Sequence, residues 1–197
     1  EPLAGGRVDW DTPIQEFWLY HVDRMMQWGL DGMYIDDPYI YPSYNDRLGR
    51  AWTDETGKLR PSYGMLGLRD YFRRLRTLAH ERSQTPWIDI HMSAQNMLPF
   101  YLYCDSFVNG EHLNLRLKEH YVGELRVEEI LAQYTGYPWG LAPYLLPELE
   151  AEARKKPEPT RELFGLLAAH DVWFWRGWCL KKEIDRPLKA LQGEFGI

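Results

Sequence analysis

The chain has 197 residues, of which 45% are hydrophobic and 15% aromatic, enough for one sizeable core. Its formal net charge is −6, and its densest basic cluster, Arg73-Arg74-Leu75-Arg76, lies within a helical pattern, so we expect no nucleic-acid partner. No apolar run reaches the length of a membrane span. These properties predict a single domain, residues 1–197, with no membrane span.

The first predicted elements are a helix and a strand. Thr12 is a suitable N-cap and Pro13 a suitable first helical residue, and Gly29 is a natural stop. Apolar and aromatic residues fall on one face of this helix at helical spacing: Ile14, Trp18, His21, Met25 and Trp28. The run 33–36 then predicts a buried strand.

The next segment, residues 38–61, is polar and rich in Gly and Pro, which predicts a long irregular loop. Its tyrosines and tryptophan are unusual in disordered loops, so we expect it to fold over the mouth of a site. A second helix is predicted over 63–82. The strict alternation in 87–92 predicts a strand with Ile88, Ile90 and Met92 on one face and Asp89 and His91 on the other.

The same alternation continues to the end of the chain. Strands are predicted over 105–109, 139–144 and 172–175, and helices over 94–103, 127–134, 147–155, 160–169 and 180–191. Strands alternating with helices imply an α/β fold with a parallel sheet. About five strands, against the eight of a (β/α)8 TIM barrel, predict the later strands of such a barrel, and the start at Glu1 rather than Met predicts a piece of a longer protein. The alternative is a self-contained doubly wound sheet.

Acidic residues and histidines stand at the ends of three predicted strands. Asp36 and Asp37 end the first, His91 lies near the end of the second, and Glu111 and His112 follow the third. The carboxyl ends of parallel strands share one edge of a sheet, where active sites are found. Glycoside hydrolysis uses paired carboxylates, one of which stays protonated near neutral pH, and adjacent carboxylates disfavour simultaneous ionisation. Asp-Asp-Pro also fits a simple turn.

A set of short motifs resembles the catalytic domain of glycoside hydrolase family 123 and its relatives: GLDGMYIDDP, HMSAQN, FVNGEHL, GYPWGLAPYLLPE and LLAAHDVWFW. The resemblance implies a TIM barrel and a β-N-acetylgalactosaminidase-like activity in which the substrate's 2-acetamido oxygen attacks the anomeric carbon. It implies that Asp36 polarises the acetamido group and that Asp37 stands where the family has the acid/base Glu. Asp is one methylene shorter, and displacing a proton donor by about 1 Å costs on the order of 10²-fold in rate.

This departure gives Glu111 a possible role as the acid/base. A strand-end Asp as nucleophile with Glu111 as acid/base would be a double displacement, which needs carboxyl groups about 5 to 5.5 Å apart. We therefore predict Asp36, Asp37 and Glu111 as the catalytic acids without assigning every role.

Aromatic and histidine side chains are the predicted substrate-binding residues, because rings pack on the C–H faces of sugars. His91 is expected to bind a sugar hydroxyl or steer a carboxylate. The predicted set is Tyr34, Tyr39, His91, His112, Trp139 and Trp175, each of which also fits a core role. His170-Asp171 is interpreted as structural.

Two other classes of protein fit the same residues. One is a carbohydrate-binding module that has lost catalysis, favoured by the Asp37 departure. The other is a metal-dependent hydrolase, although no HExxH or comparable ligand motif is present and the two cysteines have no zinc-type spacing. We expect a carbohydrate substrate, no metal and no cofactor. Neither the oligomeric state nor the compartment is indicated.

Overall fold

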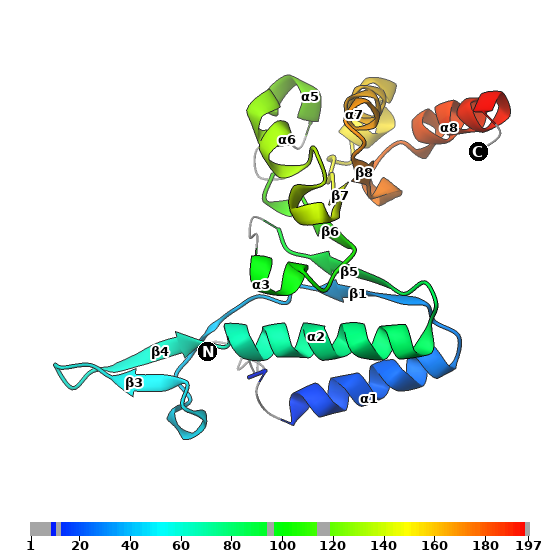
Figure 1. The fold of residues 1–197 in the computed structure, drawn as a ribbon. Coiled ribbons are helices and arrows are strands. Elements are labelled where there is room, and N and C mark those ends of the chain that lie inside the picture. Colours follow the sequence, from blue (N-terminus) through cyan, green and yellow to red (C-terminus); the bar gives the residue numbers. More distant parts are fainter. Residues whose placement is uncertain (1–8, 11–12, 94–96, 114–118, 196–197) are drawn as a thin grey trace. The chain divides into compact units, whose positions relative to one another are not determined.

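The computed structural model describes residues 9–10, 13–93, 97–113 and 119–195 (Figure 1). The protein belongs to the α/β class, as predicted. It divides into two compact units, one formed by residues 1–90 and 97–105, the other by residues 91–96 and 106–197. A closed barrel is not seen in the described ranges. None of the helices in them combines the length and apolarity needed to cross a bilayer.

Helices α1 (Ile14–Gln27) and α2 (Met65–Arg82) pack side by side in the first unit (Figure 1). The buried stripe of α1 runs through Leu19, Val22 and Met26, one position later than predicted. Trp18 and Trp28, which belong to the predicted apolar face, are 44% and 76% exposed, so that face is not the buried one. Two apolar stripes offset by one residue both have helical periodicity, and periodicity alone does not choose between them.

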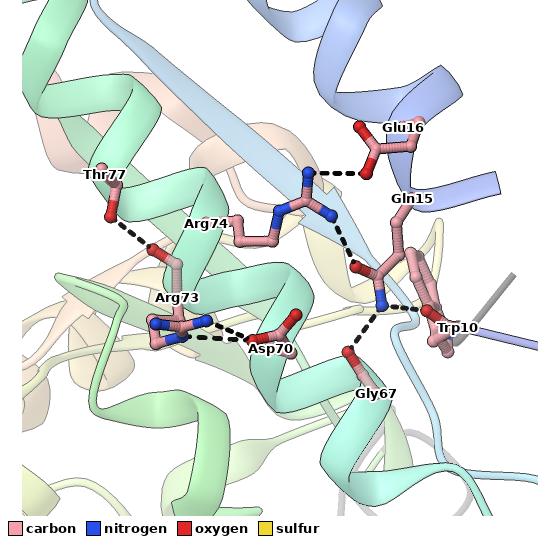
Figure 2. Close-up of polar contacts among 8 residues, drawn as sticks. All are labelled: Trp10, Gln15, Glu16, Gly67, Asp70, Arg73, Arg74 and Thr77. Carbon is pink, nitrogen blue, oxygen red and sulfur yellow. Dashed lines mark hydrogen bonds and ion pairs between the residues drawn. The ribbon is translucent and has the colours of Figure 1, made fainter. Parts of the chain in front are cut away.

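Gln15 joins the two helices through its buried side-chain amide (Figure 2). Its Nε2 donates to the carbonyl oxygens of Gly67, at 3.0 Å, and Trp10, while Arg74 donates to its Oε1 at 3.2 Å. The other end of the Arg74 guanidinium pairs with Glu16 at 2.7 Å. A buried amide is tolerated here because its donors and acceptor are satisfied. The predicted N-cap Thr12 lies outside the described residues, and Pro13 occupies the N-cap position.

The parallel strands of the first unit are β1 (Gly32–Asp36) and β5 (Trp87–His91), which are hydrogen-bonded neighbours. The backbone N–H of Trp87 donates to the Asp31 carbonyl at 3.0 Å, so the two strands start side by side and run in the same direction. A Cβ on Gly32 would lie 2.6 Å from the Trp87 carbonyl oxygen, which explains the glycine at this position. Strand β1 is half-exposed rather than buried as predicted, because the described residues provide a neighbour on one edge only.

The segment predicted as an irregular loop contains a three-stranded antiparallel sheet. Its strands are β2 (Pro42–Ser43), β3 (Ala51–Thr53) and β4 (Leu59–Tyr63), in the order β2-β4-β3, with a short 3-10 turn η1 (Asp46–Leu48) between the first two. The prediction failed because the strands are short and their side chains largely exposed, so they lack the apolar alternation that marks a half-buried strand.

The first unit is completed by α3 (Leu98–Tyr101) and a polar link to β5. Asp105 accepts from Arg76 Nη2 at 2.6 Å and from the Ile88 backbone N–H at 2.7 Å. The helix predicted over 94–103 is shorter than expected, because α3 spans only Leu98–Tyr101. Residues 94–96 of the prediction lie outside the described residues.

The second unit contains the parallel strands β6 (Ser106–Asn109), β7 (Ala142–Leu145) and β8 (Trp173–Phe174), in that order. Ser106 pairs with Ala142, and Leu145 pairs with both Asn109 and Phe174. The helices that accompany them are α5 (Tyr121–Glu124), α6 (Val127–Gln133), α7 (Pro157–Ala169) and α8 (Lys181–Phe195). Short 3-10 turns are η2 (Glu111–Leu113), η3 (Pro138–Gly140), η4 (Ala153–Lys155) and η5 (Arg176–Trp178).

Two predictions for this unit were wrong. The helix expected over 147–155 is reduced to η4, with Pro147 at the start of the irregular stretch. The strand expected from residue 139 begins at Ala142, because Trp139 has a left-handed backbone (φ 61°) inside η3, which no extended strand allows. The core beneath is apolar and includes Tyr121, whose hydroxyl accepts the Glu148 backbone N–H at 3.0 Å.

Candidate functional site

In the first unit, strand β1 delivers the two adjacent carboxylates. The strand ends at Asp36, and Asp37 has a left-handed backbone with φ 45°. The Tyr39 N–H donates to the Asp37 carbonyl at 2.7 Å, which closes a tight turn around the buried Pro38. Asp tolerates this conformation better than most residues, yet such strain is concentrated at functional sites. The alternation of a strand therefore stops between Asp36 and Asp37.

Tyr34 holds the first of these carboxylates. Its hydroxyl donates to Asp36 Oδ1 at 3.1 Å, as residues two apart on a strand share a face. Both side chains are exposed. Tyr39 lies beyond the turn, and its ring meets that of Tyr41 edge-on, with centroids 6.1 Å apart.

The second unit contains a compact polar cluster formed by His91, Ser93 and Glu111. His91 Nε2 lies 3.5 Å from Glu111 Oε2 and 3.0 Å from Ser93 Oγ. Ser93 Oγ also accepts the Glu111 backbone N–H at 3.3 Å. His91 and Ser93 are only 3% and 8% exposed, whereas the Glu111 side chain is 42% exposed. Glu111 is therefore the member that a ligand can reach.

The end of β6 explains why Glu111 is held in this place. Gly110 has φ 140°, and a Cβ there would lie 2.6 Å from the Leu146 carbonyl oxygen. The Leu146 N–H donates to the Asn109 carbonyl at 2.9 Å, and the Leu113 N–H donates to the Gly110 carbonyl at 2.9 Å. The chain thus leaves the sheet through a tight glycine turn directly into η2, which starts at Glu111.

The cluster differs from a Ser-His-acid triad. In a triad the nucleophile and the acid contact opposite nitrogens of the imidazole. Here Ser93 and Glu111 both contact Nε2 of His91. The arrangement suits proton exchange at a carboxylate better than activation of a serine nucleophile.

The strand register of the second unit separates the other predicted residues into two groups. Trp175 follows β8 directly, and its backbone N–H donates to the Leu145 carbonyl at 2.9 Å, at the strand end that carries Glu111. Trp139 precedes β7, so it lies at the opposite end of the strands from Glu111. The structure therefore does not bring Trp139 together with Glu111. His112 follows Glu111 in η2 and is half-buried.

Two features were missed by sequence reasoning. Ser93 stands two residues after His91, and that spacing was the available signal for a shared face. At the other strand end, the Tyr137 hydroxyl donates to Asp171 Oδ2 at 2.9 Å, and both residues have positive φ. This bond agrees with a structural role for Asp171.

Two hollows in the described residues lie elsewhere. One, of about 480 Å³, runs between α1 and α2 and is lined by residues such as Leu19, Arg73 and Leu78. Another, of about 260 Å³, is lined by residues such as His120, Glu150 and Pro159 in the second unit. Neither is lined by a predicted site residue.

Comparison with known proteins finds no matching family model, no curated relative and no solved structure of similar fold. The resemblance to glycoside hydrolase family 123 thus stays a prediction, and the function is argued below from the residues themselves.

Proposed function

We propose that this protein is a glycoside hydrolase that uses carboxylates for acid/base catalysis. The observation that supports this best is Glu111, a half-exposed carboxylate at the carboxyl end of β6, held 3.5 Å from the buried imidazole of His91. A carboxyl group beside an imidazole has a partner for its proton, and its exposed side faces any ligand. General acid/base groups of this kind contribute about 10²- to 10⁴-fold in rate.

The carboxylates of the first unit are assigned roles of their own in the proposed chemistry. Asp36, fixed by the Tyr34 hydroxyl, is the group that orients a 2-acetamido oxygen or attacks the anomeric carbon. In the first case the substrate supplies its own nucleophile, and N-acetylhexosamines are the expected sugars. In the second, Asp36 attacks the anomeric carbon as the leaving group departs with a proton, and water then releases the covalent glycosyl intermediate. Asp37 is the alternative proton donor.

The finer assignment of the fold belongs to the same proposal. We infer that the parallel strands are later strands of a (β/α)8-type barrel, as the family resemblance implies. Aromatic residues near strand ends are proposed to bind sugars within their own units, Tyr34 and Tyr39 in the first and Trp175 in the second.

Aryl glycosides of N-acetylgalactosamine, N-acetylglucosamine and galactose test the activity. Release from the acetamido sugars alone supports substrate assistance, release from galactose supports double displacement, and no release from any of them contradicts the proposal. A strong chelator distinguishes the metal-dependent alternative, because it would inactivate a metal-dependent hydrolase and leave a carboxylate-based glycoside hydrolase active. Binding of sugars without turnover, measured by calorimetry, would instead favour a carbohydrate-binding module.

Leaving-group dependence identifies the proton donor. An acid is needed for a poor leaving group and hardly for dinitrophenolate, so Glu111→Gln should lose about 10²-fold or more with the first and much less with the second. Asp37→Asn is compared in the same assay. The residue whose substitution causes this selective loss is the proton donor. Glu128→Gln, an exposed glutamate of α6, is the control and should behave like the wild type.

A further inference from the structure

Ser93 lies at the centre of the cluster in the second unit, although it is not one of the proposed acids. Its hydroxyl oxygen contacts the side chain of His91 and the backbone of Glu111 at once, at 3.0 Å and 3.3 Å. Because Ser93 and His91 are both buried, these contacts are shielded from water. A buried hydroxyl in such a position either only fills space in the core or holds the His91 ring and the Glu111 backbone in place.

The bonding capacity of a hydroxyl decides what Ser93 can do. Serine offers one O–H donor and two lone pairs. The Glu111 N–H takes one lone pair, which leaves the O–H and the second lone pair for His91 Nε2. Ser93 can therefore donate to an Nε2 that carries no hydrogen and accept from one that does.

This matters because Glu111 meets the same nitrogen. When the Glu111 carboxylate is ionised, an Nε2–H lies 3.5 Å from it and can point at it or at Ser93. When Glu111 has regained its proton and donates it to a bare Nε2, the single lone pair of that nitrogen is occupied, and the Ser93 O–H turns away from it. In both states the Glu111 backbone stays tied to Ser93 Oγ.

We propose that Ser93 is the positioning residue that keeps the Glu111 backbone and the His91 ring in register while the proton of Glu111 is given up and regained. The catalytic part of this inference rests on the proposed acid/base function of Glu111. Ser93 itself transfers nothing to the substrate, so its loss should lower kcat and leave KM within about twofold.

Three variants of the whole chain test this proposal. Ser93→Ala removes the hydroxyl, Ser93→Thr keeps it, and Ser106→Ala removes another buried hydroxyl, on β6 in the same unit, as a matched control. The direct readout is hydrogen exchange of the Glu111 amide, which needs no substrate. We expect exchange to be faster by on the order of tenfold in Ser93→Ala, and unchanged in Ser93→Thr and Ser106→Ala.

Activity is the second readout. With a glycoside that has a poor leaving group, kcat of Ser93→Ala should fall by between about 10- and 100-fold, and Ser93→Thr should restore most of it. Unchanged exchange of the Glu111 amide in Ser93→Ala overturns the positioning role, as does an equal effect in Ser106→Ala. Faster exchange with unchanged kcat in an active enzyme overturns the catalytic part. If the wild type hydrolyses no glycoside, the exchange experiment still decides whether Ser93 positions Glu111, and only the proposed function fails.

Discussion

Asp54 shows how a single carboxylate can organise a turn. Its Oδ1 accepts from the Thr56 N–H at 3.0 Å, the Thr56 hydroxyl at 2.7 Å and the Lys58 N–H at 3.0 Å, while Oδ2 accepts from Arg60 Nε at 2.7 Å. Asp side chains commonly close turns in this way. Asp54 therefore stabilises the connection between β3 and β4.

The same bonds predict a pH dependence. The hydrogen bonds from Thr56 and then Arg60 lower the pKa of Asp54 from 3.8 to about 2. A depressed folded-state pKa means that the stabilisation of the turn is fully present above about pH 4 and is lost as the pH falls towards 2. In NMR titrations, the Thr56 and Lys58 amide signals should shift with a midpoint near 2, and Asp54→Asn should abolish the step. A midpoint near 4 in the wild type would contradict this.

At the scale of elements, the turn between β6 and η2 depends on Gly110. Gly110→Ala would place a Cβ 2.6 Å from the Leu146 carbonyl oxygen at φ 140°, a backbone region that alanine avoids. We expect a loss of about 3 kcal/mol in the free energy of unfolding, from strain and crowding together. Urea denaturation of both proteins measures it.

Gly165→Ala is the matched control for this substitution. Gly165 lies inside α7. Apart from its two chain neighbours and its own helix backbone, no atom of the described residues comes within 4 Å of the place that an alanine methyl group would occupy. Alanine should therefore stabilise the helix by about 0.5 to 1 kcal/mol. Equal stability changes in the two variants would show that the turn tolerates a side chain.

The sequence predicts some elements well and others poorly, for physical reasons. The ends of α2 and β5 come out close to the prediction, because helical spacing and strict alternation are strong signals over these residues. Strand β3 is missed, because its stability comes from pairing and from the Asp54 turn rather than from burial. The late start of β7 is missed because the left-handed backbone at Trp139 is rare for a non-glycine residue.

For the molecule as a whole, the two cysteines report on one unit each. Cys104 is buried in the first unit, where desolvation raises its pKa, and Cys179 is half-buried in the second, where desolvation raises its pKa to about 11. Since the thiolate is the reactive form, labelling of Cys179 at pH 8 should be on the order of 10²-fold slower than that of a free thiol, and that of Cys104 slower still.

Thiol-labelling kinetics with a disulfide reagent check this order. Cys104→Ala leaves Cys179 as the reporter, and Cys179→Ala leaves Cys104. Both rates should rise with pH and approach the free-thiol rate in denaturant. Faster labelling of the Cys179→Ala protein than of the Cys104→Ala protein would refute the assignment.

The candidate site was predicted in part. The strand ends that carry Asp36, Asp37 and Glu111 follow from the local pattern, because Pro38 and Gly110 stop the strands that precede them. The pairing of His91 with Glu111 needs two segments that are far apart in the chain to meet, which the strand-end rule anticipates only coarsely. Ser93 escaped notice because a serine after a strand is common, and only its two contacts distinguish it.

The strands of the second unit have two ends with different contents, and this has a practical use. Glu111 and Trp175 lie at one end, and Trp139 and the Tyr137–Asp171 bond lie at the other. A dye or a tether for surface immobilisation attached at residue 139, which is exposed, would leave the Glu111 end unobstructed. Single-molecule or sensor formats could then use this protein without blocking the side on which a ligand is expected to arrive.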